Sequence, residues 1–363
     1  MATLRHAIIG VGASILGGHR PGLELDTAEL VGVTDVNQEI GSARAEELGV
    51  PFFADHHALL AEAKPDVVVI LAPHPFHASL TIDALDAGAH VLVEKPMAVR
   101  ASEADAMVEA AERNGKLLAI NFQHRTRGDI RAIQQLIQSG ELGKLQHVDM
   151  VAAWPRTAKY YAGGGWRGTW KGEGGGVLMN QAPHNLDLIC HLFGLPARVF
   201  AWTRTVLHNI ETEDTVHAIC EWPNGMLGSL HITTAEAGRS ERFEIVGSAG
   251  SVQIIDSELT HRRLSPDFAE IAKTSDEAMP KLSADDVAIK PLDGEGNHRE
   301  IYRNLHDAIQ NGTALVADGA SGRQSLELAN ALILSSHTGA PVELPLSRQA
   351  YDELFSKLAG QSA

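Results

Sequence analysis

The chain has 363 residues, of which 44% are hydrophobic and 21% are charged, and its formal net charge is −16. This length favours two domains over one, and the excess of acidic groups argues against a nucleic acid or an anionic membrane as partner. Cys190 and Cys220 lie in apolar stretches, where we expect unpaired thiols. No apolar run approaches the ~18 residues of a membrane span, so we expect a cytoplasmic protein.

Short apolar runs alternate with helical patterns over residues 1–120, which is typical of a parallel sheet with crossover helices. Between these runs, residues 38–48 and 102–114 carry Ala, Glu and Leu at helical spacing. The expected strands are residues 5–9, 29–34, 67–71, 90–93 and 117–120.

The pattern changes after residue 124, because one expected helix at 129–139 is followed by strands without helices between them. Asn224-Gly225 is a strong hairpin signal. Residues 264–297 read as an irregular surface excursion, and two helices near 299–310 and 322–336 are expected to close the chain. We therefore expect an α/β domain at 1–124 and an α+β domain at 125–363. The expected later strands are 146–154, 198–205, 215–221, 227–234 and 242–246.

The first strand runs directly into Gly10-Val11-Gly12, and Asp35 ends the second strand. Glycines let the backbone approach a pyrophosphate, to which the following residues, Ala13 and Ser14, would offer N–H groups. Asp35 would accept hydrogen bonds from ribose hydroxyls and repel a 2′-phosphate, which favours NAD over NADP. Ile15 stands where a third small residue is usual, so the helix would start later or pack differently. The pattern predicts a Rossmann dinucleotide-binding domain.

Two longer motifs make the chain resemble the glucose–fructose oxidoreductase and inositol dehydrogenase family, written Gfo/Idh/MocA. The first, residues 88–96, reads Gly-Ala-His-Val-Leu-Val-Glu-Lys-Pro. The second begins at the glycine run 174–176 and continues through Asn180, His184 and Asp187. Residues 65–77 also match, although Ala72 and His74 depart from the family's usual Thr-Pro-Asn.

The resemblance implies the fold, cofactor and assembly. The second domain would be an open, mostly antiparallel sheet whose outer face joins copies into a dimer or tetramer. The Lys95–Pro96 bond is often cis in the family. Beyond the glycine turn, the resemblance assigns NAD contacts to Pro73, His74, His77, Glu94 and Lys95.

Asn180, His184 and Asp187 are spaced four and three residues apart, so on one helix they would share a face. Pro183 is tolerated only in a first turn, which places the expected helix start near Asn180. In hydride transfer from a secondary alcohol, His184 would act as general base while Lys95 hydrogen-bonds the same oxygen. Asn180 is Asp in many relatives. An amide cannot act as a base, so we expect it to orient groups or bind substrate, and Asp187 to be structural.

Aromatic and basic residues gather near the second motif. Aromatic faces stack on the C–H face of a pyranose, and guanidinium groups donate to hydroxyls or a carboxylate. For Trp154 and Trp166, packing in the core or at an interface is as well supported as substrate contact. The candidate substrate-binding residues are Lys95, Arg125, Trp154, Trp166, Arg167, Asn180 and His184.

No metal is expected, because the pairs His56/His57 and His184/His191 lack a carboxylate or cysteine at ligand spacing.

These patterns predict an NAD-dependent dehydrogenase that oxidises a ring hydroxyl of a sugar, glycoside or cyclic polyol. Two other functions remain open on the same residues. One is a glycosidase or eliminase that retains NAD and uses a transient oxidation. The other is a non-catalytic NAD sensor, which would have no need of both Lys95 and His184.

Overall fold

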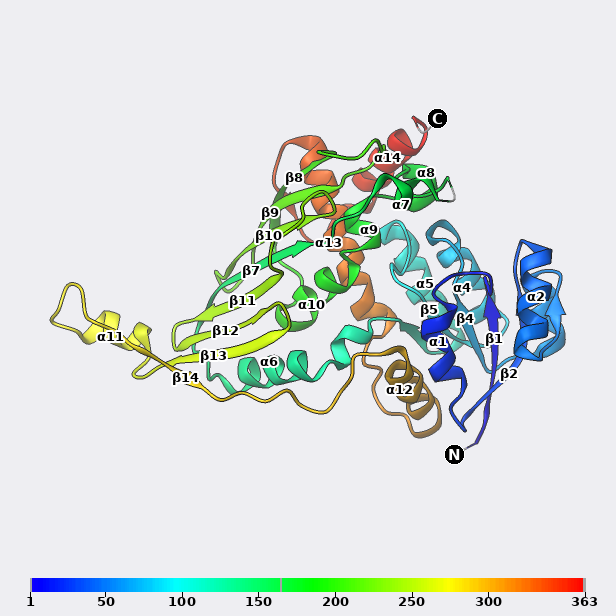
Figure 1. The fold of residues 1–363 in the computed structure, drawn as a ribbon, viewed down its shortest axis with the longest axis horizontal. Coiled ribbons are helices and arrows are strands. Elements are labelled where there is room, and N and C mark those ends of the chain that lie inside the picture. The colour runs from blue at the N-terminus through cyan, green and yellow to red at the C-terminus, as the bar shows by residue number, and fades with distance from the viewer. Residues whose placement is uncertain (1, 164, 362–363) are drawn as a thin grey trace.

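The computed structural model describes residues 2–163 and 165–361, which form two sheets joined by shared helices (Figure 1). In this part of the chain the first sheet has six strands, all parallel, in the order β3-β2-β1-β4-β5-β6. The parallel sheet expected at the N-terminus is confirmed. Its strands are β1 (Leu4–Ile9), β2 (Ala28–Thr34), β3 (Phe52–Phe53), β4 (Val67–Ile70), β5 (His90–Val93) and β6 (Leu118–Ile120).

Both faces of this sheet are covered, which explains why β4 is an unbroken apolar run. Val68 and Ile70 join the core beneath α4 and α5, whereas Val67 and Val69 join the core beneath α1 and α12. The covering helix α12 (His298–Asn311) comes from late in the sequence. The earlier helices are α1 (Leu16–Leu23), α2 (Gln38–Leu48), α3 (His56–Ala58), η1 (Leu59–Ala63), η2 (His74–Phe76), α4 (His77–Asp86) and α5 (Ala101–Asn114).

Among the described residues the second sheet has nine strands in the order β14-β13-β12-β11-β7-β10-β9-β8-β15. There β7 and β10 pair in parallel and the other neighbours are antiparallel, so the mostly antiparallel sheet is confirmed. Asn224 and Gly225 form the β9–β10 turn, as expected. The strands are β7 (Leu145–Ala153), β8 (Arg198–Arg204), β9 (Thr215–Glu221), β10 (Leu227–Thr233), β11 (Arg242–Gly247), β12 (Gly250–Ile255), β13 (Glu258–Leu264), β14 (Ala284–Val287) and β15 (Val342–Glu343).

Helix α13 (Gly319–Thr338) connects the two sheets, because it contacts β8 and α10 on one side and α5 and β6 on the other. The domain boundary after residue 124 stays a prediction, since α12 and α13 follow it in sequence and pack against α1 and α5. The remaining helices are η3 (Gln123–Thr126), α6 (Gly128–Ser139), α7 (Ala158–Ala162), α8 (Trp170–Glu173), α9 (Val177–Asn180), α10 (Pro183–Phe193), α11 (Phe268–Thr274) and α14 (Arg348–Ala359).

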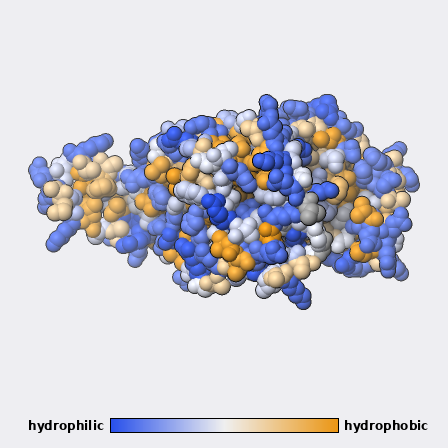
Figure 2. Space-filling view, turned by 90° about the horizontal axis from the view of Figure 1, so that it is seen from above, coloured by the Kyte–Doolittle hydropathy of each residue, from blue (hydrophilic) through white to orange (hydrophobic). Residues whose placement is uncertain are grey.

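The region 264–297 is more ordered than expected. It contains α11 and β14, and β14 pairs with β13, so the prediction of an irregular excursion is partly wrong. The arm that carries α11 stands out from the body of the molecule (Figures 1 and 2). The expectation of two closing helices was also incomplete, because α14 follows them with Tyr351, Leu354 and Leu358 at helical spacing.

Smaller expectations are also met. Cys190 and Cys220 are buried with free thiols in the described structure. The Lys95–Pro96 peptide bond is cis. None of the described helices combines the length and the apolar character that crossing a membrane requires.

Candidate active site

The glycine turn after β1 forms a close backbone surface. Gly10 has φ +88°, and a Cβ there would lie 2.7 Å from the main-chain nitrogen of Ala72. The Asp35 carboxylate accepts hydrogen bonds from the N–H groups of Gly12 (2.8 Å) and Asn37 (2.9 Å). Helix α1 begins only at Leu16, which agrees with the later helix start expected from Ile15. Ala13 and Ser14 lie in the turn between. The turn therefore fits a dinucleotide, with Asp35 in reach of a ribose.

The loop after β4 carries Pro73, His74 and His77 toward the second half of the chain. His74 Nδ1 lies 3.0 Å from the main-chain oxygen of Glu173, and burial lowers the pKa of His74 to about 3, so its ring is neutral. The His77 ring lies between the main-chain oxygens of Ala72 (2.6 Å) and Pro96 (2.8 Å). These contacts hold the loop against both halves of the site.

Glu94 lies in a buried polar cluster. His19 Nε2 and His298 Nε2 lie 2.9 Å and 3.5 Å from Glu94 Oε1, and the Asn121 amide donates to the same oxygen. Burial raises the pKa of Glu94, but the hydrogen bond from His19 and the neighbouring His298 and Lys95 outweigh it and hold the pKa well below its usual range. The Tyr302 hydroxyl, 3.0 Å from His19 Nδ1, orients that imidazole. Glu94 is therefore a fixed negative charge next to Lys95.

The Lys95 side chain crosses from β5 to the second half of the chain. Its Nζ donates a hydrogen bond of 2.8 Å to the main-chain oxygen of Asn180. Burial lowers the pKa of Lys95, whereas Glu94 and Glu173 oppose that shift by favouring the ammonium form. The ammonium group is thus held at the junction of the two sheets.

Asn180 and His184 do not share one continuous helix, so that expectation was wrong. Helix α9 ends at Asn180 and α10 begins at Pro183, because proline has no N–H to continue the helical ladder. The Asn180 side-chain Nδ2 donates to Oε1 of Glu173, and Oε2 of Glu173 accepts from the N–H of Gly168 at 2.6 Å. Burial raises the pKa of Glu173, and both hydrogen bonds oppose that rise.

His184 stacks on His124 with ring centroids 4.2 Å apart, and Phe122 packs edge-on at 5.9 Å. Burial, together with His124 and Lys95, lowers the pKa of His184 well below its ordinary 6.5. Its Nδ1 is buried and has no hydrogen-bond partner among the described residues. His184 is therefore a neutral imidazole at neutral pH, which is the form that a general base requires.

Arg125 lies behind this site in a buried, two-pronged ion pair. Its Nε and NH2 donate to the Asp187 carboxylate at 2.8 and 2.6 Å, and its NH1 donates to Val316 and Ser321. The side chains of Arg125 and Asp187 are 3% and 0% exposed. This geometry favours a structural role for Arg125 over the substrate contact expected from the sequence, and it agrees with the structural role expected for Asp187.

The aromatic segment, residues 154–163 and 165–170, lies close to the same region. The guanidinium of Arg167 lies 4.6 Å from the ring centre of Tyr160 and 4.7 Å from that of Trp166. Trp166 in turn meets His74 edge-on at 5.7 Å, whereas Trp154 packs against the core at the end of β7. The structure thus brings Trp166 and Arg167 to the predicted site and gives Trp154 a packing role.

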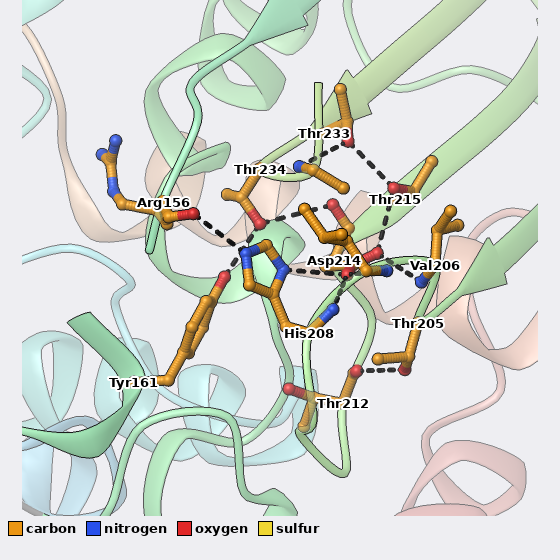
Figure 3. Close-up of polar contacts among 12 residues, drawn as sticks. Arg156, Tyr161, Thr205, Val206, His208, Thr212, Asp214, Thr215, Thr233 and Thr234 are labelled. Carbon is orange, nitrogen blue, oxygen red and sulfur yellow. Dashed lines mark hydrogen bonds and ion pairs between the residues drawn. The ribbon is translucent and has the colours of Figure 1, made fainter. Parts of the chain in front are cut away.

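A buried network attaches this segment to the second sheet (Figure 3). The Asp214 carboxylate accepts from the main-chain N–H groups of Val206, Leu207 and His208 and contacts the His208 ring. Burial raises the pKa of Asp214, but the three N–H donors outweigh it and lower that pKa. His208 Nε2 reaches the Arg156 main-chain oxygen (3.0 Å), and the hydroxyls of Tyr161 and Thr234 lie 2.8 Å apart. The network fixes the base of the aromatic segment.

Two groups of the described residues bring possible metal-ligating atoms within 4.8 Å of one another: His19/Glu94/His298 and His56/His57/Asp83. The sequence suggested no carboxylate for His56 and His57, and Asp83 of α4 corrects this. Within these groups, hydrogen-bond contacts join His19 to Glu94 at 2.9 Å and His56 to Asp83 at 3.0 Å.

Four site residues were not anticipated: His19, His124, Glu173 and His298. Glu173 directly precedes the glycine run, and His124 directly precedes Arg125, so proximity to predicted residues could have indicated both. His298 has no such signal, because only the return of α12 to the first sheet brings it to Glu94.

Two parts of the chain match models of known protein families. Residues 4–122 match the model described as oxidoreductase family, NAD-binding Rossmann fold, and residues 130–253 match the GFO/IDH/MocA C-terminal domain. The chain belongs to the GFO/IDH/MocA family. It is thereby an NAD(P)-dependent oxidoreductase that acts on CH–OH groups, with an N-terminal NAD-binding Rossmann domain.

Several members of the family are similar over nearly the whole chain. The WlbA dehydrogenase from Chromobacterium violaceum, solved with NADH and UDP-GlcNAcA, is 31% identical, with a TM-score of 0.83 over 96% of this chain and 97% of that one. D-Glucoside 3-dehydrogenase of Escherichia coli is 28% identical over 94% of this chain and 97% of its own length. The NADP(+)-dependent scyllo-inositol 2-dehydrogenase IolW of Bacillus subtilis is 24% identical over 92% of this chain and 94% of its own length.

The Arg125–Asp187 pair predicts a large stability effect. Replacing Arg125 with Ala leaves a buried carboxylate without its cation, which costs about 3–5 kcal/mol of unfolding free energy. Urea denaturation measures it, with the exposed Arg113→Ala as control, since Arg113 pairs with Asp86 at the surface. A loss below about 1 kcal/mol would contradict the structural role.

The position of Asp35 predicts cofactor preference. Asp35→Ala should weaken NAD binding about tenfold or more, since hydrogen bonds to a charged group contribute about 1.5–3 kcal/mol. NADP binding should change less, because the carboxylate no longer repels the 2′-phosphate. Fluorescence titration with NADH and NADPH measures both, with the exposed Glu39→Ala on α2 as control. An unchanged preference would exclude Asp35 as the ribose ligand.

Proposed function

We propose that the protein oxidises a secondary ring hydroxyl of a pyranoside or sugar derivative, with His184 as general base and Lys95 assisting. The observation that carries this proposal is the meeting of an ammonium and a neutral imidazole in one buried site, where Lys95 helps to lower the pKa of His184. A sensor that only binds NAD would need neither group in that state.

The nicotinamide ring supplies the hydride acceptor when NAD is bound. The neutral imidazole of His184 takes the hydroxyl proton as the carbon–oxygen double bond forms. Lys95, held by the main-chain oxygen of Asn180, donates a hydrogen bond to the substrate oxygen and stabilises the negative charge that develops there. The Asn180 amide lies next to Lys95 and would contact the substrate.

The substrate class follows from the aromatic segment and from the relatives. The guanidinium of Arg167 between Tyr160 and Trp166 offers donors next to flat apolar surfaces, which suits a pyranose. Two similar proteins, the D-glucoside 3-dehydrogenase and the WlbA dehydrogenase solved with UDP-GlcNAcA, are both associated with sugar derivatives. We favour a glucoside-like ring and its 3-hydroxyl, with cyclic polyols as the neighbouring class.

The outer face of the second sheet supports the proposal of a homo-oligomer. Trp202, Ile219 and Leu227 are 51%, 58% and 55% exposed on adjacent strands β8, β9 and β10. Exposed large apolar side chains gathered on one sheet face suit contact with a second copy. We propose a cytoplasmic location on the two unpaired thiols.

The proposed base and its partner predict matched kinetic losses. His184→Ala and Lys95→Ala should each lower kcat/KM by about 10²-fold or more, while the Kd for NAD changes only a few-fold. His191→Ala is the matched control, since it lies on the same helix and contacts Gln134. Near-normal turnover of either site variant would refute the assignment.

The burial of His184 predicts the pH profile. A general base works when deprotonated, and burial moves the pKa of His184 down, so the acid limb of kcat/KM should lie well below pH 6.5. The lowered pKa of Lys95 places any alkaline limb below 10.5. An acid limb centred near or above pH 6.5 would argue against His184 as the base.

A further inference from the structure

Glu173 is a buried carboxylate that the proposed proton and hydride transfers do not use. It ends α8 directly before the glycine run and is 1% exposed. One of its oxygens accepts from the N–H of Gly168 at 2.6 Å, and the other accepts from the Asn180 amide. A buried carboxylate is costly, so its position against Asn180 calls for a role.

The contact with Glu173 decides which way the Asn180 amide faces. An ionised carboxylate only accepts hydrogen bonds, so Asn180 must turn its Nδ2 toward Glu173 and its Oδ1 away. No described residue donates to that Oδ1, and it is not among the fully buried polar atoms. The main-chain oxygen of the same residue holds the Lys95 ammonium at 2.8 Å. One residue thus holds the Lys95 ammonium with its main-chain oxygen and keeps a side-chain amide oxygen without a partner among the described residues.

We propose that Glu173 is a positioning residue: it fixes the Asn180 amide so that its Oδ1 accepts a hydrogen bond from a substrate hydroxyl. The proposal rests on the proposed function and adds a specificity rule to it. A substrate must carry, near the reacting carbon, a second hydroxyl that donates to Oδ1. An analogue without that hydroxyl leaves the amide oxygen unpaired in the closed site, which lowers its kcat/KM.

A glutamine at position 173 would reverse the amide. It has one carbonyl oxygen where the carboxylate has two, and the Gly168 N–H needs that oxygen. Its NH2 group then faces Asn180 and captures Oδ1, which removes the acceptor from the substrate. Glu173→Gln therefore tests orientation with almost no change in shape.

The first experiment compares kcat/KM for an active glycoside and its 2-deoxy, 4-deoxy and 6-deoxy analogues in the wild type and in Glu173→Gln. In the wild type, one of the deletions should cost about tenfold or more. In Glu173→Gln the parent should lose about tenfold, and that same deletion should then cost less than about threefold. Glu327→Gln, which loosens a buried pair with Arg348, is the control and should keep the wild-type ratio. If Glu173→Gln keeps the wild-type ratio of kcat/KM between the parent glycoside and that deoxy analogue, the proposal is wrong.

The second experiment needs no substrate. Asn180→Asp places two carboxylates in contact, so one must hold a proton and has a raised pKa. The stability this proton provides is present at low pH and is lost as pH rises through that pKa, so the Tm of Asn180→Asp should fall relative to wild type between about pH 5 and 8. Asn180→Asp with Glu173→Gln should show no such pH trend, because the glutamine NH2 donates to the new carboxylate. If the Tm difference between Asn180→Asp and the wild type does not change with pH, the contact between Glu173 and residue 180 is contradicted.

The two experiments separate the two proposals. Wild-type enzyme that turns over none of the sugars would refute the proposed function, while the Tm measurement still decides whether Glu173 sets the amide. If the enzyme is active but Glu173→Gln leaves the ratio of kcat/KM between the parent glycoside and its deoxy analogue unchanged, only the specificity rule is refuted.

Discussion

The partly buried ammonium group of Lys95, between the two sheets, requires partners from both halves of the chain. Burial removes water from Lys95 Nζ just after β5. A hydrogen bond to the main-chain oxygen of Asn180 and the negative charges of Glu94 and Glu173 compensate for that loss. A buried charge without such partners costs several kcal/mol, so the partners have to be present together. They come from both halves of the chain, and the two halves must therefore meet in one arrangement.

Late helices complete the polar cluster around Glu94 and connect the two sheets. Helix α12 covers one face of that sheet and brings His298 to Glu94 and Tyr302 to His19. Helix α13 contacts both sheets, and the Arg125–Asp187 pair connects η3 to α10 just behind His184. These contacts hold a positive Lys95 close enough to help keep His184 neutral, and a neutral imidazole is the form that can accept a proton from an alcohol.

Much of the fold could be predicted because its signals are local. Helical spacing placed α2 at Gln38–Leu48, and the strand before the Glu-Lys-Pro motif was placed at His90–Val93, as observed. The partners of buried polar groups were not predictable in this way. His19 and Tyr302 are 283 positions apart, and Arg125 and Asp187 are 62 apart.

Some errors had local causes. Counting spacing alone put Asn180 and His184 on one helix, although Pro183 already marked a new start. Arg125 was assigned to substrate because a guanidinium suits a sugar, whereas its charge is already used by Asp187. The apolar spacing of α14 is also a local signal, since Tyr351, Leu354 and Leu358 recur at helical intervals.

Net oxidation of a sugar ring by bound NAD can be measured in a single assay. Purified protein and NAD are mixed with alkyl glucosides, UDP-sugars, free hexoses and inositols, and NADH absorbance is followed while the sugar products are identified. We expect NADH to form with a pyranoside, together with an equal amount of the keto derivative of that sugar. Cleavage of a sugar without net NADH, or no reaction in the presence of proven NAD binding, would contradict it.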